Sequence, residues 1–274
     1  IKYFEMSHLF TQWGAEHAPK IVAEVDGEKK RIFGWETDAD SEEYRDFLHR
    51  FAAALTAFID RKGIRNFYRF HVSDEPSLEQ YEVYKKRADL IADIFPGFKI
   101  IDALSDIEFF DKGAVKYPIP SEDHVEDFVG KVDEFWTYYC CGQHNKNVPN
   151  RFFAMPSARN RILGTLLYKY NATGFLQWGY NYWYSQFSKH EIDPFTVTDA
   201  GKAFPSGDAF VVYPGEDGQP INSLRFKVFY DGLQDLAAMR LLESLVGREK
   251  ALEIAIQDDE LTFQKYPHGS SYLL

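Results

Sequence analysis

The sequence predicts an α/β fold, a (β/α)8 TIM-type barrel that lacks its first one or two strands. Two observations predict it: strand and helix signals alternate along all 274 residues, and no glycine-rich phosphate loop follows any strand. Such alternation is typical of a parallel sheet with helical crossovers. The missing loop disfavours the alternative, an open nucleotide-binding sheet. Because no composition break or flexible linker interrupts the pattern, we expect residues 1–274 to form one barrel domain.

Six segments have the composition of β-strands. They are residues 2–10, 64–71, 98–104, 131–139, 173–179 and 209–213. In a barrel that lacks two strands, 2–10 is the third strand and 64–71 the fourth. The chain begins without Met and shows no signal-peptide pattern, so we expect it to be an internal part of a longer protein.

Amphipathic helical segments separate these strands. Residues 40–43 (Asp-Ser-Glu-Glu) have the form of a capping box, and Gly63 ends the helix behind it. A second capping box, Ser77–Gln80, opens the next helix, which stops at Pro96-Gly97. Further helices are expected near 124–130, 157–170, 223–246 and 249–257.

Composition excludes several classes of protein. The net charge of -11 disfavours nucleic-acid binding, which needs a basic surface. No run of 18 apolar residues is present, so no membrane span is predicted. Cys140 and Cys141 are adjacent, a geometry that strains a disulfide, and we expect reduced thiols. Without CxxC or HxH patterns, we expect no metal and no other cofactor.

The candidate catalytic residues are Asp74 and Glu75. They follow strand 64–71 directly and are stopped by Pro76, at the strand end where α/β barrels place their chemistry. The alternative is structural, because acidic residues near a helix N-terminus are stabilised by the helix dipole.

The spacing of this acid pair constrains the mechanism. Retaining glycosidases usually hold two carboxyls about 5–5.5 Å apart on either side of the scissile bond. Neighbours in sequence cannot easily straddle a sugar in that way. They suit a substrate-assisted route, in which one carboxylate orients a 2-acetamido group and the other protonates the leaving oxygen. Two close acids should also raise one pKa.

Aromatic and polar side chains after other strands are candidates for sugar binding, because aromatic faces suit the apolar faces of sugar rings. The aromatic candidates are Trp13, Trp35, Trp136, Tyr138, Trp178 and Trp183. The weaker polar candidates are His8, His71, Asn181 and Arg225. Core packing is the alternative for each aromatic residue, and His71 could orient the acid pair. Asp102 and Asp106 rank below Asp74 and Glu75 as a second acid site.

These segments resemble glycoside hydrolase family 123 and the related domain of unknown function 4091. The Ser-Asp-Glu-Pro frame around Asp74 and Glu75 is the most specific match, followed by Leu176-Gln177-Trp178. Other matching segments are Ser7-His8-Leu9, Gln12-Trp13-Gly14, residues 33–37, 136–139, 213–215 and 223–225, with Asp231-Gly232. They run in family order over nearly the whole chain.

The resemblance implies a retaining exo-acting β-N-acetylgalactosaminidase on a (β/α)8 barrel. It implies that Asp74 orients the acetamido group and that Glu75 is the acid/base. Tyr138 would donate a hydrogen bond from its hydroxyl to the acetamido oxygen, and Trp136, Trp178 and Trp183 would line the sugar-binding site. The partner implied is a glycan with a terminal 2-acetamido sugar. Family members also carry an N-terminal β-sandwich, so such a domain of the same protein is a further expected partner, and a secreted or periplasmic setting is favoured.

Two other functions remain open at this point. A non-catalytic carbohydrate-binding barrel would use the aromatic rim alone. A metal-dependent hydrolase is disfavoured by the missing HxH and HExxH patterns.

Overall fold

The computed structural model describes residues 3–256 and 260–273. The chain divides into two compact units. The first comprises Ile1–Pro120 and Gly130–Asp133, and the second comprises Ser121–Val129 and Glu134–Leu274. The expectation of a single domain over 1–274 stays a prediction.

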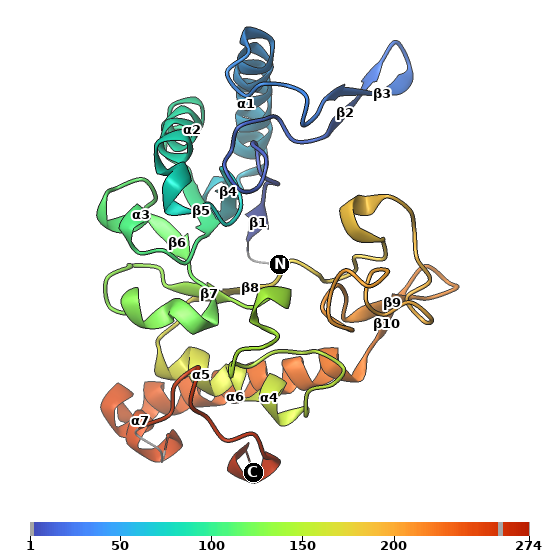
Figure 1. Cartoon of the computed structure of the whole chain (residues 1–274). Helices are drawn as coiled ribbons and strands as arrows, with labels where there is room; N and C mark the ends of the chain where they lie inside the picture. The colour runs from blue at the N-terminus through green and yellow to red at the C-terminus, as the bar shows by residue number, and fades with distance from the viewer. Residues whose placement is uncertain (1–2, 257–259, 274) are drawn as a thin grey trace. The chain divides into compact units, whose positions relative to one another are not determined.

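The first unit is built on a parallel sheet of four short strands (Figure 1). In hydrogen-bonded order they are β1 (Phe4–Glu5), β4 (Tyr68–Phe70), β5 (Lys99–Ala103) and β6 (Tyr117–Ile119). All three pairings are parallel. The strands are shorter than predicted, since the 3-10 helix η1 (Arg65–Phe67) occupies the start of segment 64–71. Residue 2 of the predicted strand 2–10 lies outside the described residues.

Helical crossovers connect these strands. The chain passes from β1 to β4 through α1 (Glu42–Lys62), and from β4 to β5 through η2 (Leu78–Gln80) and α2 (Tyr81–Ile94). It passes from β5 to β6 through the short helix α3 (Glu108–Asp111). Parallel strands joined by helical crossovers are typical of α/β folds.

The capping box predicted at Ser77 is confirmed, and α1 begins within the predicted segment 40–43, although its cap is Ser41 and not Asp40. The Ser41 side chain accepts a hydrogen bond from the Tyr44 amide, and α1 ends at Gly63, whose φ of 65° is left-handed. At Ser77 the reciprocal capping box with Gln80 is formed. Local side chain–backbone pairing therefore determines where these helices begin.

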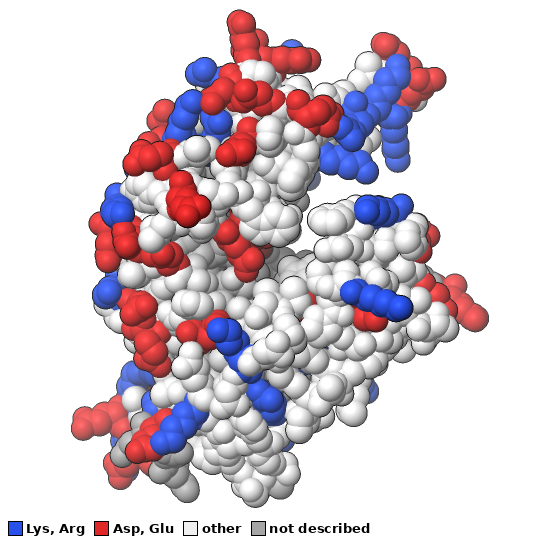
Figure 2. All heavy atoms as spheres, viewed as in Figure 1, with Lys and Arg blue, Asp and Glu red and all other residues white. Residues whose placement is uncertain are grey.

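An antiparallel hairpin that the strand pattern did not predict lies between β1 and α1. It consists of β2 (Ile21–Val25) and β3 (Glu28–Phe33). Asp26 and Gly27 join them with φ values of 55° and 80°, as a two-residue turn of the mirror-image type requires. Figure 2 shows acidic and basic side chains intermixed over this hairpin. The charged residues of β3 are not typical of a strand, so the sequence pattern does not predict it, although Asp-Gly is typical of a hairpin turn.

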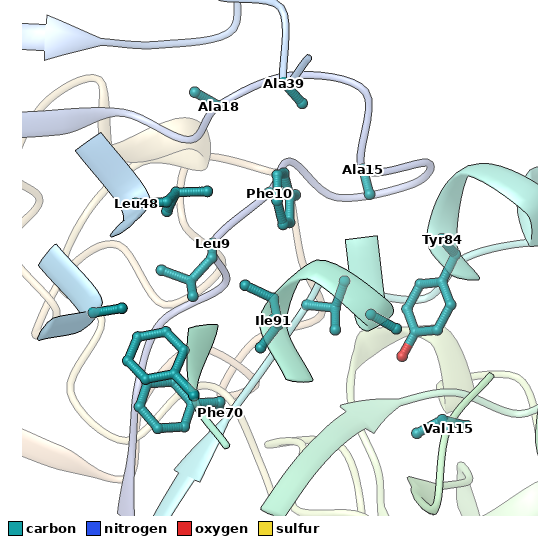
Figure 3. Packing of buried hydrophobic residues seen from close by; sticks show 14 of the residues in the cluster. Leu9, Phe10, Ala15, Ala18, Ala39, Leu48, Phe70, Tyr84, Ile91 and Val115 are labelled. Carbon is teal, nitrogen blue, oxygen red and sulfur yellow. The ribbon is translucent and has the colours of Figure 1, made fainter. Parts of the chain in front are cut away.

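The core of the first unit packs α1 and α2 against the sheet and the segment after β1. Figure 3 shows Phe10, Leu48, Phe70 and Ile91 among the side chains of this cluster. The Phe70 ring stacks on Phe95 with 3.9 Å between centroids. Full burial of such a side chain contributes about 1.5–3 kcal/mol. This packing supports β4, and Asp74 and Glu75 follow the carboxyl end of that strand.

The second unit contains a parallel strand pair and four helices among its described residues. The pair is β7 (Trp136–Tyr138) and β8 (Gly174–Leu176). The helices are α4 (Ala158–Arg161), α5 (Leu163–Lys169), α6 (Leu224–Val246) and α7 (Arg248–Ala255). Single-turn or short 3-10 helices are η3 (Glu122–Asp127), η4 (Cys141–Gln143), η5 (Gln186–Ser188) and η6 (Ser270–Leu273).

Two glycines allow close packing in this unit. A Cβ atom on Gly164 would lie 1.8 Å from the carbonyl oxygen of Gly232, so α5 and α6 meet backbone to backbone. A Cβ atom on Gly174 would lie 2.2 Å from the Trp136 ring, which therefore covers β8. A side chain at either position would force these elements apart.

The strand predicted at 209–213 is wrong as a member of the parallel sheet. The observed strand β9 (Val212–Pro214) pairs antiparallel with β10 (Pro220–Asn222) across a turn. A short turn joins β9 to β10, and the two strands form a local hairpin. The predicted helix 157–170 is divided at Ile162, and 124–130 forms a 3-10 helix instead. Residue 257 of the predicted last helix lies outside the described range.

The structure therefore confirms a mixed α/β fold with parallel strands. Over residues 3–256 and 260–273 no closed barrel is detected. Within the same ranges, no helix combines the length and apolar character that crossing a bilayer requires.

Candidate active site

Asp74 and Glu75 follow β4 at its carboxyl end, as predicted. The segment between them and the strand is buried, and the Ser73 hydroxyl donates to the Thr11 carbonyl at 2.7 Å. The Glu75 amide donates to the carbonyl of Ala103, the last residue of β5, at 3.0 Å. Hydrogen bonds to the backbone of two neighbouring segments thus fix the acid pair at this edge of the sheet.

The Asp74 carboxyl is half-buried and held by Gln12. The Gln12 side-chain amide donates to Oδ2 of Asp74 at 2.9 Å, and the Trp13 backbone amide donates to the Asp74 carbonyl at 3.0 Å. Burial raises the pKa of Asp74, and the charge of Asp102 adds to this, while Gln12 and His71 oppose it. The expected rise in one pKa therefore falls on Asp74, and its causes are burial and Asp102.

Glu75 lies in a different environment, exposed to solvent. Its φ of 44° is in the left-handed region, where a non-glycine residue costs on the order of 1–3 kcal/mol. Trp13 and Ala15, on the facing segment, have φ values of 54° and 56°. The Gln80 side chain donates to the Trp13 carbonyl and ties that segment to the start of α2. Strained backbone held by neighbouring contacts is frequent at functional sites.

A cluster of ionisable side chains adjoins Asp74. His71 places Nδ1 3.3 Å from Asp102 and Nε2 3.5 Å from Glu5. His8 packs edge-on against His71 with 5.3 Å between ring centroids, and its Nε2 lies 3.9 Å from Oδ1 of Asp74. The structure therefore brings the predicted residues His8, His71 and Asp74 together.

Sequence reasoning missed most of what supports this cluster. Asp102 is fully buried and accepts hydrogen bonds from the Val72 amide at 3.1 Å and the Tyr84 hydroxyl at 2.5 Å. The sequence alone suggests Asp102 only as part of a second acid site. The sequence feature that could have indicated this role is a lone Asp inside an apolar strand, because a buried carboxyl needs a polar partner. Asp106, the other such candidate, accepts from the Glu108 amide at the start of α3.

His8, His71 and Asp102 also have the spacing of a metal site, with ligand atoms within 4.8 Å of one another. The hydrogen bonds argue against that use. Both nitrogens of His71 face carboxylate oxygens, and both oxygens of Asp102 accept from protein donors. A metal ion would have to displace these contacts before the two residues could bind it.

The remaining predicted residues differ in exposure. Trp13 and Trp35 of the first unit are each 53% exposed, and Trp178 of the second unit is 40% exposed. Asn181 is exposed beside its backbone bridge to Phe210. Exposed indoles are available to a ligand, and their role in sugar binding stays a prediction.

Other predicted residues in the second unit are buried or form hydrogen bonds within the protein. Trp136 and Tyr138 are 6% and 4% exposed on β7. The Trp183 indole donates to the Val212 carbonyl at 3.0 Å. The Arg225 guanidinium donates to the Gly207 carbonyl at 2.6 Å, and burial is the main cause that lowers its pKa to about 10. Their part in substrate binding likewise stays a prediction.

Asp208 is an unpredicted residue that fixes Trp178. It is fully buried and accepts from the Trp178 indole at 3.0 Å and from the Gln177 amide at 3.3 Å. Arg151 donates to the Gln177 side chain, the Gly179 carbonyl and the Asp208 carbonyl. Burial raises the pKa of Asp208 to about 6, against the opposing effect of Arg151. The sequence offers only a weak signal, an Asp directly before an apolar strand segment.

A separate hollow in the second unit has a volume of about 390 Å³. It is lined by Asn222, Phe226, Lys227, Tyr230 and Asp231, along β10 and α6. None of these was a predicted site residue.

A parallel α/β sheet with paired carboxyls at a strand end is an arrangement that sugar-cleaving enzymes use, and the comparisons with known proteins agree. The family model described as "Glycoside hydrolase 123, catalytic domain" matches residues 1–242. The chain therefore belongs to glycoside hydrolase family 123. No curated protein matches the sequence.

Several solved structures are similar to this chain, and one of them is of a known member of the family. It is described as showing "the details of glycolipid glycan hydrolysis by the structural analysis of a family 123 glycoside hydrolase from Clostridium perfringens". The TM-score is 0.64 at 19% identity, over 86% of this chain and 42% of that one. At this level of sequence identity, the structural similarity shows that the two chains share a fold. The chain spans less than half the length of that structure's chain.

Proposed function

We propose that this domain is a retaining exo-glycoside hydrolase that releases terminal β-N-acetylgalactosamine, or a related 2-acetamido sugar, by a substrate-assisted oxazoline mechanism. Membership of family 123 supports the class of reaction. The observation that carries the mechanism is that two adjacent carboxyls occupy different environments, one half-buried and held, the other exposed.

In the first step the acetamido oxygen of the substrate attacks the anomeric carbon, and the glycosidic bond breaks. The leaving oxygen takes a proton from Glu75. The Asp74 carboxylate accepts the acetamido N–H and stabilises the positive charge of the oxazolinium. Gln12 occupies Oδ2 of Asp74, which leaves Oδ1 for this contact.

In the second step water attacks the same carbon and gives a proton to Glu75, now a carboxylate. The ring of the intermediate opens, and the sugar leaves with its original anomeric configuration. An exposed Glu75 suits both steps, because it must meet first the leaving group and then water. A fixed Asp74 suits orientation, because that role needs no movement.

The test compares two substrates in two variants. Glu75→Gln should lower kcat/KM about 10²–10⁴-fold on a natural glycan with terminal β-N-acetylgalactosamine. On an aryl glycoside whose leaving group needs no proton, its loss in the first step should be far smaller. Asp74→Asn should lower turnover of both substrates, since both form the oxazolinium.

The matched control is Glu79→Gln, which alters an exposed carboxyl on the neighbouring η2 and should leave both rates unchanged. If Asp74→Asn and Glu75→Gln retain full activity on the natural glycan, the site assignment is wrong. Sugar binding without turnover, unaffected by Asp74→Asn, would instead favour the carbohydrate-binding alternative.

A further inference from the structure

The ionisable cluster beside Asp74 has a defined charge pattern. Its negative groups are Glu5 on β1, Asp102 on β5 and Asp74 itself, and His71 lies among them. The Tyr84 hydroxyl of α2 donates to Asp102. Among the described residues, His8, which follows β1, also packs against the His71 ring. His71 therefore lies among three carboxyls, and His8 is the second histidine of the cluster.

The contacts of His71 define its protonation state. Nδ1 faces Asp102 at 3.3 Å and Nε2 faces Glu5 at 3.5 Å. An ionised carboxylate only accepts hydrogen bonds, so both nitrogens must carry a proton for both contacts to be favourable. Only the imidazolium form meets that condition. Burial alone would lower the pKa of His71, but Asp102 and Glu5 outweigh it and raise this pKa to about 9.

His8 is the opposite case. Burial and the nearby charge of His71 lower the pKa of His8 to about 4. His8 is therefore neutral near pH 7 and adds no charge at Asp74, although its Nε2 lies 3.9 Å from Oδ1. The positive charge that reaches Asp74 comes from His71, and the opposing negative charge comes from Asp102.

We propose that His71 is a positioning residue: held as an imidazolium between Glu5 and Asp102, it supplies the positive charge that keeps Asp74 a carboxylate. The part of this inference that concerns turnover rests on the proposed function, in which ionised Asp74 accepts the acetamido N–H. Without the imidazolium, Asp74 faces buried Asp102 with no compensating charge, and protonation of Asp74 becomes more favourable.

The first experiment needs no turnover. Long-range ¹⁵N–¹H spectra of the imidazole rings in the whole chain should show both His71 nitrogens protonated between pH 5 and 8, with loss of the proton at about 9. His8 should remain neutral down to about pH 5. Glu5→Gln should lower the pKa of His71, and Glu43→Gln, an exposed carboxyl on α1, should not. A neutral His71 at pH 7 would overturn the proposal.

The second experiment follows Asp74 directly. The ¹³C shift of its carboxyl should titrate at higher pH in His71→Gln than in the unmodified chain. The double variant His71→Gln/Asp102→Asn should reverse much of that change, because the opposing charge is gone. An Asp74 titration unchanged by His71→Gln would refute the positioning role. If His71→Gln does not fold, the effect of Glu5→Gln on the pKa of His71 still decides whether the carboxyls hold His71 as an imidazolium.

Measurements of turnover distinguish a failure of this inference from a failure of the proposed function. His71→Gln should lose a larger fraction of kcat/KM at pH 5 than at pH 7.5, because without the imidazolium Asp74 takes up its proton at a higher pH. An equal loss at both pH values would indicate a structural role only and would contradict the proposal. Absence of turnover in the unmodified chain would refute the proposed function, and the two spectroscopic results would still decide the charge state of His71.

Discussion

Replacement of Asp208 by Asn should remove a pH-dependent cost from the folded state. The Asp208 carboxyl is fully buried, and burial raises its pKa from the usual 3.8 to about 6. An Asn side chain keeps an oxygen that can accept from the Trp178 indole, which now donates at 3.0 Å. The substitution therefore removes the charge while preserving the main contact.

The magnitude follows from the displaced titration. About two pKa units at 1.36 kcal/mol each amount to about 3 kcal/mol. Well below pH 3.8 the carboxyl holds its proton in both states, and the cost is nearly absent. As the pH rises from 4 through 6, the unfolded chain loses the proton first, so the folded state loses stability. Above about pH 7 the full cost is present.

The assay is urea unfolding at pH 4, 5, 6 and 7, followed by tryptophan fluorescence. The stability difference between Asp208→Asn and the unmodified chain should move in favour of the variant by about 2–3 kcal/mol from pH 4 to pH 7. Asp231→Asn, which removes an exposed carboxyl on α6, should show a flat difference. A flat or opposite trend for Asp208→Asn would refute the reasoning.

Three further predictions concern packing, the acid pair and a helix cap. Gly164→Ala places a Cβ atom 1.8 Å from the Gly232 carbonyl oxygen and should destabilise the second unit by about 1–3 kcal/mol or more in urea unfolding; an unchanged midpoint would contradict the close crossing. Gln12→Ala removes the 2.9 Å hydrogen bond to Asp74, so the Asp74 pKa should rise further and activity should fall most at acidic pH; a uniform loss across pH would count against this role. Ser41→Ala removes the N-cap of α1 and should cost about 1 kcal/mol, whereas Ser41→Asp should restore most of it; equal losses would show that capping is not the cause.

Local features of the fold could be predicted from the sequence. The helix starts at Ser41 and Ser77 depend on side chains within three residues, so the pattern contains the information. The same holds for the acid pair at the end of β4, since Pro76 and the second capping box follow directly. The hairpin turn at Asp26-Gly27 was also visible, but the charged β3 hid it.

Contacts between distant segments could not be predicted in this way. His71 meets Asp102 from another strand, 31 residues away, and Gln12 meets Asp74 across 62 residues. No periodicity specifies which buried acid faces which base. The direction of β9 was missed for a related reason, because pairing with β10 depends on the turn between them and on neither strand alone.

The most direct test of the central claim is the affinity for a thiazoline analogue of the oxazoline intermediate, measured by calorimetry in the unmodified chain and two variants. If Asp74 stabilises that intermediate, Asp74→Asn should weaken binding at least tenfold, about 1.4 kcal/mol, while Glu75→Gln should change it little. Equal affinity in the unmodified chain and Asp74→Asn would contradict the substrate-assisted mechanism.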